Sequence, residues 1–76
     1  MEMSLERLEL GLRGTVTEIK TSEPLRCRLR QFGLIPGTEV GIRYRSPDGG
    51  VTALELRGTV IAVRTRELKK IRVKVL

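Results

Sequence analysis

Residues 39–64 read EVGIRYRSPDGGVTALELRGTVIAVR, and this stretch decides the fold. Apolar and polar residues alternate through residues 39–45 and again through residues 52–57, which is typical of strands with one buried face. Tyr44 lies on the apolar face of the first segment and is expected in the core. Pro47–Gly50 has the residues of a tight hairpin connection. The stretch therefore predicts consecutive antiparallel strands.

A further strand is predicted at Val60–Arg64, after a short turn at Gly58. The segment is apolar at both odd and even positions, which is typical of strands covered on both faces. We therefore expect it to lie in the centre of the sheet.

The first strand is predicted at Leu12–Ile19, which is rich in β-branched residues. Val16 and Ile19 are three residues apart, so they cannot share one face of a regular strand. We expect a bulge or an early end near Thr17–Glu18, or burial on both faces. Upstream of this strand, Ser4 is expected to cap a short helical turn with an apolar face, formed by Leu5 and Leu8.

One helix is predicted at about residues 22–32. Thr21 or Ser22 suits the cap position, and Pro24 is tolerated in the first turn. Gly33 ends the helix, because glycine adopts the left-handed conformation of this position without cost. The apolar stripe expected to face the core consists of Leu25, Leu29 and Phe32.

The C-terminal residues predict one short turn and one strand. Thr65–Lys70 has no alternation and suits a single turn of 3₁₀ helix. Apolar and basic residues then alternate from Ile71 to Val75. In total the sequence predicts a mainly β domain over residues 1–76, a small five-stranded SH3-like barrel with one inserted helix. The 3₁₀ turn before the last strand favours this barrel over an OB-fold.

Composition argues against catalysis and against a built-in metal centre. The chain has 76 residues, no histidine and one cysteine, Cys27. No disulfide can form within the chain, and a structural zinc site needs about four ligands. General acid–base and nucleophilic sites usually use histidine or a shielded nucleophile. We therefore expect a binding protein that is not an enzyme, requires no cofactor, and has Cys27 as its only candidate metal ligand.

The sequence also carries signs of the protein's cellular location and of its relation to the membrane. No apolar run approaches the ~18–20 residues that cross a bilayer, and the first residues do not resemble a signal peptide. A free thiol without an export signal predicts a cytoplasmic protein that is not embedded in the membrane. A free strand edge would also support a homo-oligomer.

The net charge of +6 suggests an acidic partner, and nucleic acid is one alternative. Barrels that bind single strands stack bases on aromatic side chains. The aromatic residues here, Phe32 and Tyr44, are both expected in the core, so nucleic-acid binding is not favoured. Phosphate contacts would then have to come from arginines alone, namely Arg43, Arg45, Arg57, Arg64 and Arg66.

Three segments of the chain match, in order, the sequence patterns of one known protein family. The opening Leu5, Leu8, Gly11, Gly14, Val16 and Ile19 is similar to an L-x-x-L-x-x-G-x-x-G-x-V-x-x-I pattern. Residues 25–40, LRCRLRQFGLIPGTEV, are similar to the family's L-R-x-R-L-x-x-x-G-L-x-P-G-T-x-V stretch. The closing segment is similar to an x-R-G-x-x-I-A-L-R-x-x-E-x-x-x-I-x-V pattern, through Leu56, Arg57, Gly58, Ile61, Ala62, Val63, Arg64, Glu67, Ile71 and Val73. Together the three segments resemble the FeoA family of small ferrous iron transport proteins. Residues 46–50, SPDGG, depart from the G-D-P that many members carry in this loop.

The resemblance implies a stand-alone SH3-like domain and a role in iron uptake. It implies a protein partner, the membrane permease FeoB with its cytoplasmic GTP-binding domain, and regulation of that transporter by contact. Fe²⁺ or another divalent ion would be the transported cargo. A weak transition-metal carrier that uses Cys27 remains an alternative. The surface expected to contact the partner is the helix and the turn after it, with Arg26, Arg30, Leu34, Ile35 and Pro36 projecting.

Overall fold

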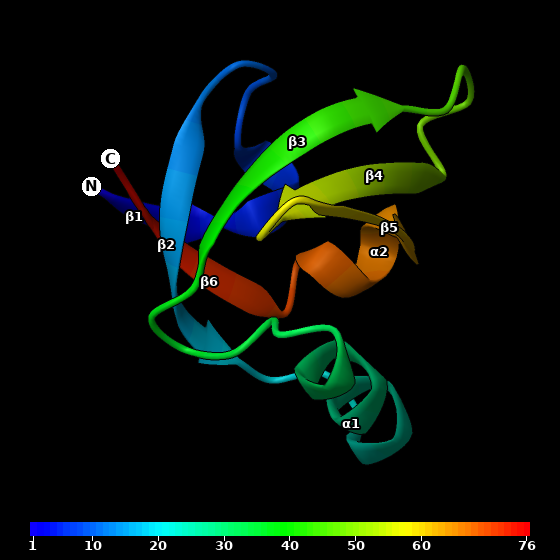
Figure 1. The fold of residues 1–76 in the computed structure, drawn as a ribbon. Coiled ribbons are helices and arrows are strands. Elements are labelled where there is room, and N and C mark those ends of the chain that lie inside the picture. The colour runs from blue at the N-terminus through cyan, green and yellow to red at the C-terminus, as the bar shows by residue number, and fades with distance from the viewer.

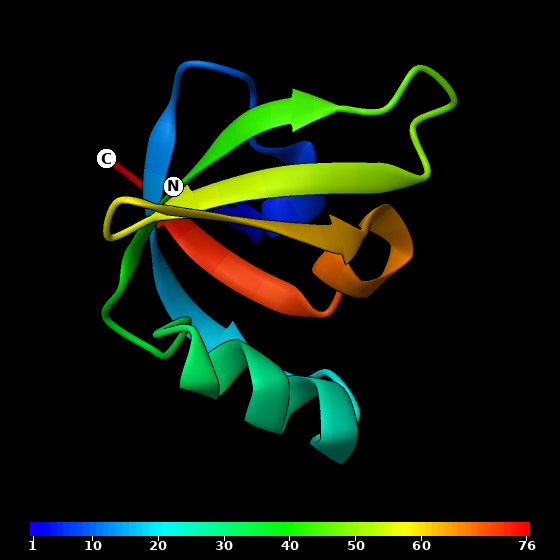
Figure 2. The same ribbon diagram turned by 45° about the vertical axis from the view of Figure 1, so that its right-hand side comes forward.

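Six strands form one antiparallel sheet in the order β1-β6-β2-β3-β4-β5, and the sheet curls into a barrel (Figures 1 and 2). The computed structural model describes all residues 1–76. The elements are β1 (Glu2–Ser4), the 3₁₀ turn η1 (Leu5–Arg7), β2 (Arg13–Ile19), α1 (Glu23–Gln31), β3 (Glu39–Arg45), β4 (Val51–Leu56), β5 (Thr59–Arg64), α2 (Thr65–Leu68) and β6 (Ile71–Val75). The mainly β fold with one inserted helix is confirmed, with one more strand than predicted.

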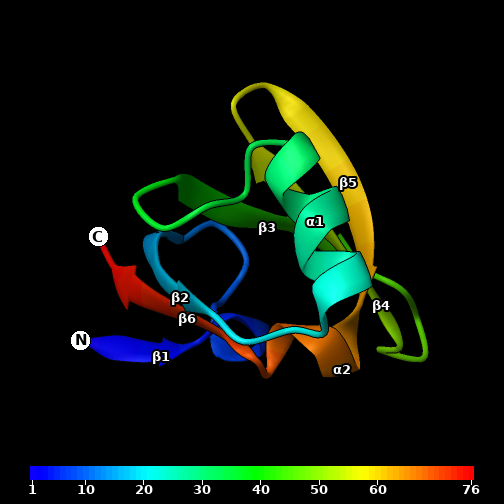
Figure 3. The ribbon, with the colours of Figure 1, turned by 90° about the horizontal axis from the view of Figure 1, so that it is seen from below.

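The additional strand, β1, pairs with β6 near both ends of the chain. Glu2 lies opposite Lys74, and the Val75 N–H donates to the Met1 carbonyl at 2.9 Å. Three residues are too few to show an alternation, and the partner strand is about 70 residues away, so local sequence carried no sign of this pairing. The N- and C-termini consequently lie side by side (Figures 1 and 3).

The core lies inside the curled sheet and consists of fourteen buried apolar side chains. Leu5 and Leu8 from the N-terminal turn are completely buried. The turn predicted there is present, but Ser4 makes no side-chain capping bond. Leu54, Leu56, Ile71 and Val73 contribute from the strands. The N-terminal leucines therefore belong to the same core as the sheet.

Two irregularities in strand pairing decide which side chains face inward. β2 shifts register against β6 between Val16 and Glu18, which confirms the bulge expected there. A second shift, between Ile42 and Tyr44, was not predicted. It turns Tyr44 outward, where 59% of the residue is exposed, so its expected place in the core is wrong. Arg45 turns inward instead, and its Nη2 donates to the carbonyls of Glu6 and Leu8 at 2.9 and 2.8 Å.

Helix α1 begins and ends close to the predicted residues. Ser22 is the N-cap residue, without a side-chain bond, and Gly33 follows the helix with φ of +95°. The Gly33 N–H donates to Arg30 and the Leu34 N–H to Leu29, both at 2.9 Å, which is a Schellman motif. Phe32 is 48% exposed, so its predicted place in the buried stripe is wrong. Only Leu29 of that stripe is fully buried; Leu25 is half-buried.

The last two corrections concern β5 and α2. β5 lies at the edge of the sheet, so the central position predicted for it is wrong. Its apolar residues alternate in burial, with Ile61 and Val63 inside and Val60 and Ala62 exposed. The turn predicted before the last strand is present, but it is one turn of α-helix over Thr65–Leu68 instead of the predicted 3₁₀ helix. None of the helices has both the length and the apolar character needed to cross a bilayer.

Candidate functional site

The residues predicted to contact a partner do lie together. Arg26, Arg30, Leu34, Ile35 and Pro36 line one shallow hollow, which also includes Ile19 and Glu23. α1 supplies the arginines, and the turn that connects α1 to β3 supplies the apolar residues. We call this hollow the helix–turn surface.

The members of the helix–turn surface differ in accessibility. Ile35 is 40% exposed and Pro36 is exposed, so both can contact another molecule. Leu34 is fully buried, and the prediction that it projects from the turn is wrong. The physical reason is the Schellman motif, which folds Leu34 back onto Leu29 and into the core.

The two arginines of the helix–turn surface have different electrostatic surroundings. Arg26 Nη2 is hydrogen-bonded and ion-paired to Glu23 one helical turn earlier. This hydrogen bond, with the positive charge of Arg26, lowers the pKa of Glu23 below its ordinary value. Arg30 is exposed and makes no ion pair. Arg30 is therefore the cation of this surface that is free for an external carboxylate.

The turn that carries Ile35 and Pro36 is fixed by several hydrogen bonds. Thr38 Oγ1 donates to the Gly33 carbonyl at 2.8 Å, and the Thr38 N–H donates to the Ile35 carbonyl at 3.0 Å. The Gly37 N–H donates to the Val16 carbonyl at 2.7 Å, which ties the turn to β2. Because the turn is held in place, ordering it would cost little entropy on binding.

A second hollow, which was not predicted from the sequence, lies on another face of α1. α1 lines it with Leu25, Arg28 and Leu29, and Phe32, the C-cap residue of α1, completes that side. β5 lines it with Ile61–Arg64, and α2 adds Arg66 and Glu67. We call it the α1–β5 groove. The sequence did hint at this groove, because Val60–Arg64 has apolar residues at both odd and even positions. The strand therefore has an apolar exposed side as well as a buried one.

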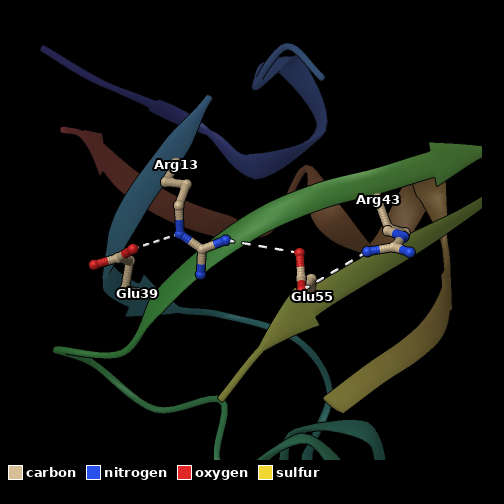
Figure 4. A network of polar contacts seen from close by, with 4 residues as sticks. All are labelled: Arg13, Glu39, Arg43 and Glu55. Carbon is tan, nitrogen blue, oxygen red and sulfur yellow. Dashed lines mark hydrogen bonds and ion pairs between the residues drawn. The ribbon is translucent and has the colours of Figure 1, made fainter. Parts of the chain in front are cut away.

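The charges on the opposite part of the sheet balance one another (Figure 4). Arg13 on β2 is ion-paired with Glu39, and its Nη1 lies 3.9 Å from Glu55 Oε1. Arg43 Nη1 lies 3.9 Å from the other oxygen of Glu55. Two cations and two carboxylates alternate, so this face has little net attraction for an anion.

The cysteine and the aromatic residues occupy separate places. Cys27 is half-buried on α1, with the Gln31 amide nitrogen 4.0 Å from its sulfur. No group of three or more Cys, Asp or Glu side chains is placed to hold a metal ion. Phe32 ends α1 and lines the α1–β5 groove, whereas Tyr44 lies on β3. Both aromatic residues are exposed, so burial no longer argues against their stacking on nucleic-acid bases. They come from different elements of the fold, however, and do not form one stacking surface with an element in common.

A family model described as the FeoA domain matches residues 3–75. Among proteins of curated function, none matches the chain. Three solved structures illustrate the likeness. The FeoA protein of Chlorobium tepidum is 28% identical with a TM-score of 0.93, over 97% of this chain and 70% of that one. A FeoA-like protein from Clostridium acetobutylicum is 32% identical with a TM-score of 0.83, over 99% and 87%.

The third structure is FeoA of Stenotrophomonas maltophilia in complex with zinc, 28% identical with a TM-score of 0.80, over 95% of this chain and 89% of that one. It is described as a prokaryotic SH3 domain protein with a proposed role as a ferrous iron transport activating factor. The likeness confirms the SH3-like fold.

Proposed function

The chain belongs to the FeoA family, and from this premise we propose that it is a cytoplasmic accessory protein of ferrous iron uptake that binds a FeoB-type permease. The observation that carries the proposal is the family match, which spans nearly the whole chain. The Stenotrophomonas relative, with its proposed role in activating ferrous iron transport, supports the same direction. In this role the protein acts by contact, and Fe²⁺ is the cargo of the transporter.

The helix–turn surface is the proposed contact with the permease. Ile35 and Pro36 offer an exposed apolar centre, and Arg26 and Arg30 stand beside it. Apolar residues with neighbouring arginines are typical of the energetic centre of protein interfaces. Arg30, which lacks an ion pair, would find a carboxylate on the GTP-binding domain.

Titration of the chain into the cytoplasmic domain of the cognate permease tests the proposal. We expect micromolar binding that Ile35→Glu weakens by about tenfold, because a charge would replace the apolar centre. Leu10→Glu is the matched control, since Leu10 is an exposed aliphatic residue outside this surface and should leave the affinity within about twofold. The proposal fails if no binding is found at tens of micromolar and deletion of the gene leaves ferrous iron uptake unchanged.

A further inference from the structure

β5 presents an unpaired strand edge. It is the last strand of the sheet, and it is joined to β4 by the two-residue turn Arg57–Gly58, with both residues at positive φ. Such a turn makes Leu56 and Thr59 a hydrogen-bonded pair. By alternation, the N–H and C=O groups of Val60, Ala62 and Arg64 then point away from β4. None of the backbone hydrogen bonds outside helices and strands involves residues 59–64.

The α1–β5 groove runs beside this edge, because four consecutive residues of β5, Ile61–Arg64, line it. Figure 3 shows α1 lying alongside β5. α1 contributes the buried Leu29, the half-buried Leu25 and the half-exposed ring of Phe32. A strand edge with an apolar channel next to it can accept both the backbone and the alternate side chains of an extended peptide.

The charge of the groove is positive and uncompensated. Arg28, Arg64 and Arg66 are exposed, and none of them makes an ion pair or a side-chain hydrogen bond. The single acid of the lining, Glu67, has Lys70 Nζ 3.7 Å away, and its buried Oε1 has no hydrogen-bond donor. The groove therefore differs from the balanced surface around Arg13 and Glu55 (Figure 4).

We infer that the α1–β5 groove binds an extended acidic segment of a partner protein, which adds to β5 as a seventh strand. Its backbone pairs with Val60, Ala62 and Arg64. Apolar side chains on one side of the segment enter the groove against Phe32, and its carboxylates meet Arg28, Arg64 and Arg66. The inference does not rest on the proposed function, because it specifies the chemistry of the segment and concerns a different surface from the helix–turn surface.

The charges favour an acidic segment over a second copy of this chain. Pairing of β5 with another β5 would bring the same arginines together on two molecules that each carry a net charge of +6. Nucleic acid would satisfy the arginines, but it has no peptide groups to pair with the strand edge. Only an acidic peptide satisfies both the edge and the charges.

The test is a titration of the full chain with an acetylated and amidated peptide that alternates Glu and Val. The peptide has about seven residues, which is within the usual length of a strand. Nuclear magnetic resonance should show slowed amide exchange at Val60, Ala62 and Arg64. The same peptide with Lys in place of Glu should bind at least about tenfold more weakly. Equal binding of the two peptides, or no protection in residues 60–64, would overturn the inference.

Two sets of variants separate charge from backbone pairing. Arg64→Glu and Arg28→Glu should each weaken binding about tenfold, whereas Arg7→Glu, an exposed arginine in the N-terminal turn, should change it less than about twofold. Peptides N-methylated at alternate amides test the pairing, since one set of amides faces β5 and the other faces solvent. Only one of the two methylated peptides should bind; equal binding of both contradicts the added strand.

A second copy of the chain and a nucleic acid, the two alternative occupants of the groove, would each give a different experimental result. Protection of residues 60–64 that rises with protein concentration without peptide, together with a dimer in sedimentation, would overturn the inference in favour of a second copy. Tighter binding of a single-stranded oligonucleotide than of the acidic peptide, without protection of β5, would overturn it in favour of nucleic acid.

Discussion

Arg45 shows how one extra residue in a strand can change the role of a side chain. The register shift between Ile42 and Tyr44 reverses which residues of β3 face inward. Arg45 thereby reaches the carbonyls of Glu6 and Leu8, two backbone groups of the N-terminal turn and its exit. A charged donor that satisfies two carbonyls fixes this turn against β3.

We predict that Arg45→Met lowers the free energy of unfolding by about 1–3 kcal/mol, because the two carbonyls lose their donor. Urea denaturation measures the change. Arg43→Met is the matched control on the same strand: Arg43 is exposed and has only a long ion pair with Glu55, so the loss should stay within about 0.5 kcal/mol. Equal losses for the two variants would contradict the role assigned to Arg45.

At the scale of elements, the close approach of β2 to β6 depends on a residue without a side chain. Gly14 lies opposite Val75, and a Cβ added to it would lie 3.2 Å from Val73 Cβ and from the Lys74 carbonyl. Both neighbours belong to the body of β6 and cannot move without the strand. The glycine thus sets the distance between the two strands.

Gly14→Ala should therefore destabilise the fold by about 1–3 kcal/mol through overpacking, measured by thermal or urea unfolding. Gly41→Ala on β3 provides the comparison. There the contact nearest to the new Cβ is Arg13 Nη1 at 3.0 Å, the end of a flexible side chain that can swing away. If Gly41→Ala were the more damaging of the two, rigid contact with β6 would not explain the effect.

The loop between β3 and β4 should respond to acid through Asp48. Its Oδ1 accepts from Ser46 Oγ at 2.6 Å and from the Gly50 N–H at 2.9 Å, and these bonds lower the pKa of Asp48 below its ordinary value of 3.8. Because the folded pKa is the lower one, the stabilisation is present above the unfolded pKa and is lost as the pH falls through the folded pKa.

Exchange of the Gly50 amide measures this effect. We expect it to accelerate below about pH 4, beyond the intrinsic pH dependence of exchange. Asp48→Asn keeps the shape of the side chain without the titration, so its protection should not change with pH in that range. A pH response that survives in Asp48→Asn would assign the titration to another group.

At the scale of the whole molecule, stability depends on a single core without covalent reinforcement. The only cysteine is free, and 76 residues bury a modest share of their surface. Leu5 and Leu8 extend this core from the N-terminal turn. The first residues of the chain are therefore part of the structural unit.

Leu5→Ala should cost about 2–5 kcal/mol, the usual range for a buried leucine, out of a total of about 5–15 kcal/mol. Chemical denaturation checks this. Leu10→Ala, at an exposed leucine, should change stability by less than about 0.5 kcal/mol. A small loss at Leu5 would mean that the N-terminal turn is not part of the cooperative core.

The sequence predicted those features that depend on neighbouring residues. The spacing of Val16 and Ile19 gave a bulge near Thr17 as one of three alternatives, and the end of α1 followed from Gly33. Features set by distant contacts were missed. Tyr44 was misplaced because nothing in the local sequence marks the register shift in β3. Phe32 was misplaced because the spacing of apolar residues on a helix does not show how much of that helix face the sheet covers. The α1–β5 groove requires three elements together, so it became visible only in the structure.

The pairing of β1 with β6 has a mechanical consequence. Glu2 faces Lys74 and Ser4 faces Arg72, so the two ends of the chain leave the sheet from the same end of this pair. A pull on both ends would open the pair one rung at a time instead of shearing all its hydrogen bonds at once. The barrel would resist tension applied between its termini only weakly, whereas tension applied between β2 and β3 would act on strands that are each paired on both sides.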